Sequence, residues 1–255
     1  MTGSARRRTG DSRYGERVPL VAAAVCPHPP LLVPEVAGAA APELDDLRAA
    51  CDAAVARLFA HEPDAVVLVG DGPATGWIRP PATGSLQPWG VDLAVPLDSE
   101  QPDRGAVLPL SLTVGAWLLA RHEERLPVAA VQVAAAADAP TLRALAGQVH
   151  DHRPRVALLV LGDGSACRGE RSPGYADPRA EPYDEGVATA LAGADAEALL
   201  GLDPVLSAEL KVAGRAPWQV LAGAARATGG DWRGELLSDT APYGVAYLVA
   251  TWEPA

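Results

Sequence analysis

Three short runs of apolar residues, at 20–25, 65–69 and 156–161, each end in polar, turn-forming residues. Each run has five or six residues and is bounded by Gly or Pro, which is typical of a strand buried on both faces. Stretches with helical periodicity separate the three runs. This alternation predicts an α/β protein with a mostly parallel central sheet flanked by helices.

The rest of the chain continues the alternation of helices and strands. In residues 42–61, apolar side chains recur every three or four positions with acids and arginines between them, which predicts an amphipathic helix. We expect further helices at 107–121, 141–152, 183–200, 204–212 and 217–228, and further strands at 91–97, 128–133 and 243–252. Residues 75–90 and 168–182 are rich in Pro, Gly or polar residues and predict long loops. No linker divides the pattern, so residues 18–255 are expected to form a single domain.

Composition and charge restrict the class of partner. The 255 residues carry a formal net charge of -11 with a pI near 4.9, whereas a nucleic-acid-binding protein needs a basic face for phosphates. Lys211 is the only lysine, a bias typical of a GC-rich, actinobacterial-type genome. Cys26, Cys51 and Cys167 are too few and too irregularly spaced for a disulfide framework. No run approaches the ~20 apolar residues of a membrane span, so we expect a cytoplasmic protein with no nucleic-acid or membrane partner.

Residues 1–17 contain five arginines and almost no apolar side chains. We expect a solvated, disordered basic tail. A secretion signal is the alternative, because the apolar run that starts at Val18 follows the basic stretch directly. That run is at the short limit for the apolar part of a signal, and His28 and a cluster of prolines follow where a cleaved linker belongs.

The best functional clue lies at the ends of the three apolar runs. In an open parallel sheet, ligands bind beyond the carboxyl ends of the strands. The runs are followed there by His28, Asp71 and Asp163, so we expect these side chains to converge on one rim. His28 lies between Pro27 and Pro29, which restrict the backbone and suit a ring nitrogen held in one direction. A histidine hydrogen-bonded within a turn is the competing interpretation.

The other four histidines, His61, His122, His150 and His152, precede predicted strands rather than follow them. In a parallel sheet this places them at the opposite rim from His28, roughly 17–20 Å away across one strand. The spacing of His150 and His152 suits a metal site, but the helix dipole alone favours a histidine at the C-terminal end of a helix. We therefore expect all four to be structural.

Asp71 and Asp163 each lie in a Gly-Asp-Gly turn, for which three interpretations are open. The glycines supply unusual backbone angles while Asp caps the next segment, or the carboxylates are metal ligands, or the glycine-rich backbone binds phosphate. Neither turn has a phosphate-loop pattern, and an acidic residue repels phosphate, so the first two interpretations are the stronger. We also place Cys26, Ser165 and Cys167 near a substrate pocket at this rim.

Several segments together resemble the LigB-like class III extradiol ring-cleavage dioxygenases and their MEMO-like relatives. Cys-Pro-His-Pro-Pro-Leu-Leu-Val-Pro-Glu at 26–35 is similar to the first-strand motif of that family. The other matching segments are Gly-Asp-Gly-Ser-Ala at 162–166, Pro-Gly-Tyr and Asp-Pro-Arg-Ala within 173–180, Tyr-Asp at 183–184, Ala-Gly-Arg-Ala-Pro at 213–217 and Ala-Pro-Tyr-Gly-Val-Ala-Tyr at 241–247. The similarity spans residues 18–253 and implies the LigB-like α/β fold.

The resemblance implies a non-haem Fe(II) held by two histidines and a glutamate, with another histidine as acid or base. His28 matches the first metal histidine. The family's second metal histidine is expected where this chain has Gly-Asp-Gly-Pro around Asp71. The histidine of the family's Gly-Asp-Leu-Ser-His segment corresponds to Ala166 in this chain. Glu235 and Asp239 are the nearest candidates for the carboxylate. The usual Fe(II) site is therefore incomplete in this sequence, because extradiol cleavage needs imidazole ligands and a base of near-neutral pKa.

Three hypotheses follow for the function of this rim. The first is a divergent LigB-like protein with a degenerate metal site, acting as a scaffold or small-molecule binder. The second is an oxidoreductase or hydrolase in which His28, Asp71 and Asp163 hold a divalent metal such as Mg²⁺ or Mn²⁺. In that enzyme, Trp77 and Trp89 offer aromatic surface to a small aromatic substrate.

The third hypothesis is a Cys–His dyad without a metal, which we rank last. Cys26 or Cys167 is then the nucleophile with His28, and the dyad needs a thiolate of lowered pKa. The family resemblance also implies a homodimer, since related dioxygenases often pair their subunits.

Overall fold

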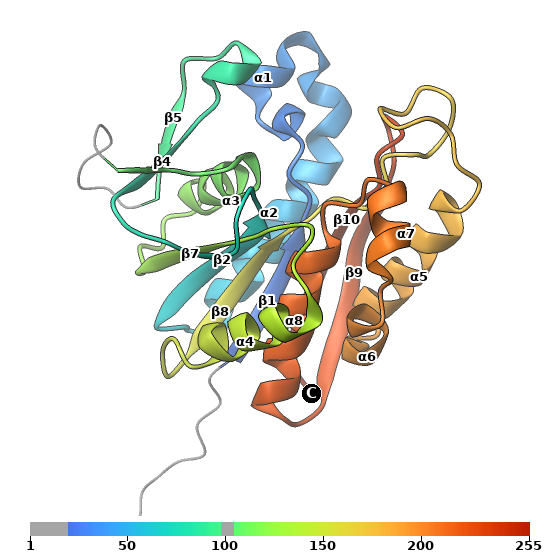
Figure 1. Ribbon diagram of the computed structural model, residues 1–255. Coiled ribbons are helices and arrows are strands. Elements are labelled where there is room, and N and C mark those ends of the chain that lie inside the picture. Colours follow the sequence, from blue (N-terminus) through green and yellow to red (C-terminus); the bar gives the residue numbers. More distant parts are fainter. Residues whose placement is uncertain (1–19, 98–104) are drawn as a thin grey trace, which may run out of the picture.

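Four parallel strands form the centre of the computed structural model, which describes residues 20–97 and 105–255. They are β1 (Leu20–Cys26), β2 (Ala65–Asp71), β7 (Val128–Val133) and β8 (Val156–Leu161). The antiparallel strands β3 (Gly76–Ile78), β10 (Tyr247–Pro254) and β9 (Trp232–Thr240) complete the sheet. The order across the seven-stranded sheet is β3-β7-β2-β8-β1-β10-β9 (Figure 1). The predicted α/β fold, with a largely parallel core flanked by helices, is confirmed.

Helices cover both faces of the sheet because the central strands are buried on both sides. One layer contains α4 (Ala139–His150), α5 (Ala180–Ala192), α6 (Ala196–Leu200), α7 (Pro204–Glu209) and α8 (Arg215–Thr228). The other layer contains α2 (Asp45–Ala60) and α3 (Leu110–Ala120). Between β1 and α2 the chain forms η1 (Pro30–Leu32), α1 (Pro34–Ala37) and η2 (Gly38–Leu44). Along β1, Val25 faces the first layer and Cys26 the second, as the alternation of side chains in a strand requires.

The segment predicted as a loop at 75–90 contains short strands. Strand β3 pairs with β7, and η3 (Gln87–Trp89) lies near the end of this segment. A separate three-stranded sheet consists of β5 (Ala94–Pro96), β4 (Ala82–Ser85) and β6 (Ala106–Val107). The strand predicted at 91–97 corresponds to β5 in this small sheet. Strands of two to four residues are too short to produce a recognisable alternation in the sequence.

Strand β9 is a second departure from the sequence-based expectation. It includes Arg233, Glu235 and Asp239, and all its side chains are half-buried or exposed, so it lacks the apolar run of the central strands. It lies at the end of the sheet, where polar side chains are common because one edge is unpaired. The helix predicted at 183–200 is two helices, since Asp195 accepts a hydrogen bond from the backbone N–H of Ala198 and starts α6.

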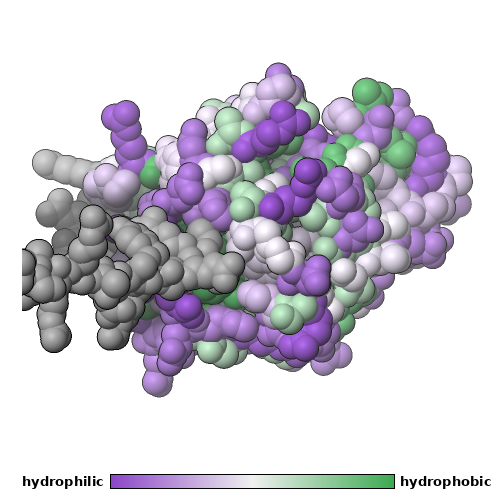
Figure 2. Space-filling model, turned by 90° about the horizontal axis from the view of Figure 1, so that it is seen from below, coloured by the Kyte–Doolittle hydropathy of each residue, from purple (hydrophilic) through white to green (hydrophobic). Residues whose placement is uncertain are grey.

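Among residues 20–97 and 105–255, no helix is long and apolar enough to cross a membrane. Figure 2 shows the end of the molecule at which the parallel strands begin. The visible part of that end is covered mainly by hydrophilic residues, with hydrophobic ones scattered among them. The basic tail predicted at 1–17 lies outside the described residues.

Candidate functional site

The carboxyl ends of β1, β2 and β8 bring His28, Asp71 and Asp163 together, and we call these three residues the rim cluster. Strand β8 lies between β1 and β2, so residues that follow these strands share one rim. Nε2 of His28 lies 3.1 Å from Oδ1 of Asp71, and Nδ1 lies 3.5 Å from Oδ1 of Asp163. The same Asp163 oxygen accepts a hydrogen bond from the backbone N–H of His28 at 2.8 Å. The two carboxylates thus lie against opposite edges of one imidazole ring.

The three side chains of the rim cluster differ in how much of each is exposed to solvent. The Asp71 side chain is 35% exposed, that of Asp163 is 16% exposed, and that of His28 is 7% exposed. The hydroxyl of Ser111 in α3 fixes the backbone at Asp71 by donating a hydrogen bond of 2.6 Å to its carbonyl. Asp71 therefore presents the carboxylate that a ligand from solution meets first, with the imidazole behind it.

The charges of the two aspartates keep the His28 ring protonated at neutral pH. Burial opposes the charged ring, but the charges of Asp163 and Asp71 outweigh burial and raise the pKa of His28 to about 9. Burial raises the pKa of Asp163, and the neighbouring His28 charge offsets part of that effect. An imidazolium between two carboxylates is a hydrogen-bond donor and not a base.

The rim cluster does not fit the Fe(II) site that the sequence resemblance implies. Fe(II) requires two imidazoles and a carboxylate on one ion, whereas the cluster has one imidazole and the chain has Ala166 where the family has a further histidine. The two carboxylates face different ring nitrogens, so one ion cannot bind all three side chains in this arrangement. Within the described residues, no group of three or more His, Cys, Asp or Glu side chains is placed to hold a metal ion.

Comparison with known proteins gives a likeness in structure. No family model matches the chain, and no curated protein matches its sequence. Among solved structures, the chain is similar to the uncharacterized protein JW3007 from Escherichia coli K12, with 15% sequence identity and a TM-score of 0.46. The similarity covers 91% of this chain and 99% of that one.

Hydrogen bonds from distant parts of the chain fix the turn that carries Asp163. The buried carboxylate of Asp184 in α5 accepts hydrogen bonds from both the backbone N–H and the hydroxyl of Ser165. The carbonyl of Asp163 accepts a hydrogen bond from Gly214, and the N–H of the next residue donates to the carbonyl of Ala246. Ser165, predicted near a substrate pocket, is therefore buried and bonded within the turn. Asp184 acts on the rim cluster as a positioning residue.

Tyr247, at the start of β10, belongs to the same rim but was not predicted as a site residue. Its side chain is buried, and burial together with the charge of Asp163 raises the pKa of its hydroxyl above the usual range. Strand β10 runs antiparallel to β1, so it begins at the rim where β1 ends. The sequence predicts a strand at 243–252 but not its direction, and the direction is what places Tyr247.

Trp77 and Trp89, the tryptophans predicted to offer aromatic surface, make their described contacts with residues outside the rim cluster. Trp77 packs against the α4–α8 layer and stacks on His152, with ring centroids 4.8 Å apart. Its indole N–H donates to Gln148 in α4. Strand β3 runs antiparallel to β7 and pairs Trp77 with Val131, and no described contact joins Trp77 to the rim cluster. Trp89 is 38% exposed on η3, and no described contact joins it to the cluster.

The cysteines predicted near the pocket lie in opposite layers, and neither supports a Cys–His dyad. Cys26 is buried in the layer of α2, where its hydrogen bond with Cys51 raises the pKa of the Cys51 thiol. Cys167 lies in the other layer, where burial raises its pKa and its thiol donates to the carbonyl of Leu210. A nucleophilic thiolate at Cys167 needs a pKa shift in the opposite direction.

The other four histidines have partners away from the rim cluster, as their positions before the strands predict. These partners are Glu253 for His61, Asp52 for His122, Thr228 for His150 and Trp77 for His152. No described contact joins the candidate carboxylates for a family-type iron site to the rim cluster. Glu235 pairs with Arg57, and Asp239 is exposed on β9, the outermost strand.

Proposed function

We propose that this chain is a divergent LigB-like protein that binds a small molecule at the rim cluster and lacks the family's Fe(II) site. The placement of His28 between Asp71 and Asp163 carries the proposal, because the ring is flanked by two carboxylates and not by the second imidazole that the family's iron site requires. The motifs at 26–35 and 162–166 include His28 and Asp163 and support the family assignment.

The chemistry of the rim cluster favours a small ligand that carries a positive charge or hydrogen-bond donors. Asp71 presents an accessible carboxylate at the solvent side of the cluster. The hydroxyl of Tyr247, close enough to respond to the charge of Asp163, adds a hydrogen-bonding group. If the ligand has an aromatic ring, exposed Trp89 is the remaining candidate among the two predicted tryptophans.

Tyramine and 3-(4-hydroxyphenyl)propionate are suitable probes, because they share a phenol ring and carry opposite charges. We expect tyramine to bind and to shift the NMR resonances of the His28 ring, and the propionate not to bind. Asp71→Asn should weaken tyramine binding about tenfold, the size of one charge-assisted contact. Asp151→Asn, which removes an 81% exposed carboxylate at the opposite rim, is the matched control. Equal binding of the two probes, or unchanged tyramine affinity in Asp71→Asn, contradicts the proposed ligand class.

Metal analysis tests the proposed loss of the iron site separately. Protein purified anaerobically from iron-supplemented medium is expected to hold no stoichiometric iron, because the rim cluster supplies one imidazole instead of two. Mass spectrometry of the metal content measures this directly. One tightly held iron per chain that is lost in His28→Gln would overturn this part of the proposal.

A second candidate is a metal-dependent enzyme in which the same three side chains hold Mg²⁺ or Mn²⁺. It is favoured by one observation: Nδ1 of His28 and Oδ1 of Asp71 are buried and have no well-aligned hydrogen-bond partner among the described residues. Binding requires the ring to turn, so that one nitrogen and both carboxylates meet at a single ion. Mn²⁺ titration followed by electron paramagnetic resonance separates the two candidates. A single site that His28→Gln abolishes supports the enzyme, and no binding at millimolar Mn²⁺ removes it.

A further inference from the structure

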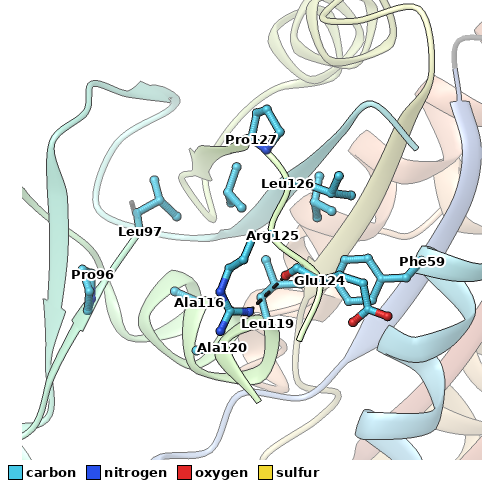
Figure 3. A pocket seen from close by; sticks show the side chains of 12 residues that line it. Phe59, Pro96, Leu97, Ala116, Leu119, Ala120, Glu124, Arg125, Leu126 and Pro127 are labelled. Carbon is cyan, nitrogen blue, oxygen red and sulfur yellow. Dashed lines mark hydrogen bonds between the residues drawn. The ribbon is translucent and has the colours of Figure 1, made fainter. Parts of the chain in front are cut away.

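A cavity of about 410 Å³ lies at the rim opposite to the rim cluster, where β2 and β7 begin. Its walls come from the end of α2, from the last turns of α3 and from the end of β5 (Figure 3). Val66 and Val128, near the starts of their strands, also line it. The volume lies within the range of roughly 300–1,000 Å³ that is typical of small-molecule sites in proteins.

Most of the cavity lining is apolar. Phe59, Leu97, Leu119 and Leu126 surround the space, and Pro127 lies at its edge (Figure 3). Leu97 and Leu119 are each only 8% exposed and belong to the core layer of α2 and α3, so these walls are held in place by packing. An apolar ligand that enters the cavity replaces water with contacts to a preformed surface, which is favourable.

Arg125 supplies the main polar feature of the cavity. Its side chain lies across the cavity beside Leu119 and Ala120, whereas the carboxylate of Glu124 lies at the margin (Figure 3). The Nη1 atom of Arg125 donates to the backbone carbonyls of His122 and Glu124. Among the described residues, no acceptor faces the Nε and Nη2 atoms of Arg125, and no carboxylate pairs with its guanidinium. These two donors are therefore available to a ligand.

We propose that this cavity binds an amphiphilic monocarboxylate, with a medium-length aliphatic or arylalkyl chain in the apolar space and its carboxylate on Arg125. A guanidinium binds a carboxylate through two parallel N–H donors, and Nε with Nη2 forms such a fork. The site is independent of the function proposed for the rim cluster, because it lies at the other end of the strands. A cationic amphiphile held by Glu124 is the competing occupant.

Octanoate, octan-1-ol and octylamine share one chain and differ in their head groups, so they separate these occupants. By calorimetry, octanoate is expected to bind most tightly and octylamine most weakly. Arg125→Gln should weaken octanoate binding about tenfold and leave octanol binding unchanged, because only the charged contact is lost. Arg143→Gln, which changes an exposed arginine on α4 outside the cavity, is the matched control.

A second variant tests the location of the site. Ala120→Trp places a large ring at the mouth of the cavity and is expected to abolish binding of both octanoate and octanol. Ala120 is the exposed last residue of α3, so the melting temperature of the free protein should stay close to that of the wild type. The proposal is overturned if octylamine binds more tightly than octanoate, if either variant leaves octanoate affinity unchanged, or if none of the three compounds binds.

Discussion

The proton on His28 is held by charges that come from two other strands. Asp71 ends β2 and Asp163 follows β8, and they contact opposite nitrogens of the ring. Each carboxylate stabilises the imidazolium, and burial lets this attraction act with little screening by water. The fold therefore couples the protonation of one side chain to the relative positions of three strands.

The raised pKa of His28 makes folding stability depend on pH. Its pKa is about 9 in the folded protein against an ordinary value of 6.5. Below about pH 6.5 the ring is protonated in both states and the stabilisation is complete, and it is lost as the pH rises through about 9. The advantage of wild type over His28→Gln in unfolding free energy should therefore shrink by on the order of 2–3 kcal/mol across this window. Urea unfolding at about pH 6 and about pH 10 measures the change.

An NMR titration of the His28 ring provides the independent check. The midpoint should lie well above 6.5 in wild type and should move down in Asp71→Asn, because one stabilising charge is removed. A wild-type ring that titrates at its ordinary value would show that the two carboxylates do not hold the proton.

The members of the rim cluster are predictable from the sequence, but their geometry is not. Parallel strand ends share a rim, so the order of strands and turns is enough to bring His28, Asp71 and Asp163 together. Which ring nitrogen each carboxylate faces depends on side-chain directions that no sequence pattern contains. The direction of the three-residue strand that carries Trp77, antiparallel at the edge of the sheet, is also absent from the sequence pattern. The position of Tyr247 likewise depends on the direction of β10.

Among the strands of the main sheet, apolar patterning predicts the central ones and β10 and misses β3 and β9 at the two edges. Strands β1 and β8 are apolar runs with every residue buried, and their bounds match the prediction to within one residue. Strand β9 is half-buried or exposed throughout, and only Trp232, Leu236 and Leu237 pack against the core, so its sequence has no continuous apolar run. Apolar patterning therefore fails for strands at the edges of the sheet, where hydrogen bonding to one neighbouring strand is enough to form a strand.

The turn after β8 depends on close contact with the start of α8. A Cβ atom at Gly162 would lie 2.5 Å from Cα of Gly214 and 3.0 Å from Nε1 of Trp218, so a larger residue forces the backbone to shift. Gly162→Ala is expected to destabilise the protein by about 2 kcal/mol or more. Gly147→Ala, in α4 with nothing near its Cβ position, should instead stabilise it by about 0.5–1 kcal/mol. If urea unfolding shows that both variants change the free energy of unfolding in the same direction, the turn accommodates a larger residue at Gly162 without cost.

The two rims of the sheet carry different chemistry. One rim has buried charges around His28, and the other has an apolar cavity with Arg125 across it. Strands of six or seven residues separate them, which corresponds to roughly 20 Å. Groups that far apart, with no partner in common, act independently as a rule.

Additivity tests this independence at the scale of the whole molecule. The unfolding free energy of the double variant Asp71→Asn/Arg125→Gln should change by the sum of the single effects to within about 0.5 kcal/mol. Asp71→Asn should also leave octanoate affinity unchanged, and Arg125→Gln should leave tyramine affinity unchanged. A coupling energy above about 1 kcal/mol would mean that the sheet transmits changes between its ends.

The neighbours of β1 in the sheet also set the order in which the protein is able to fold. Ala23 pairs with Trp252, so β1, near the start of the described chain, has as its neighbour β10, near the end of the chain. Closing such a distant contact is slow, and β1 keeps an unpaired apolar edge until β10 has been synthesised. The hydrogen bond from Gly164 to Ala246 forms only at that stage as well. We therefore expect a nascent chain to expose an apolar strand edge until the last strand emerges, which is when protection by a chaperone should matter most.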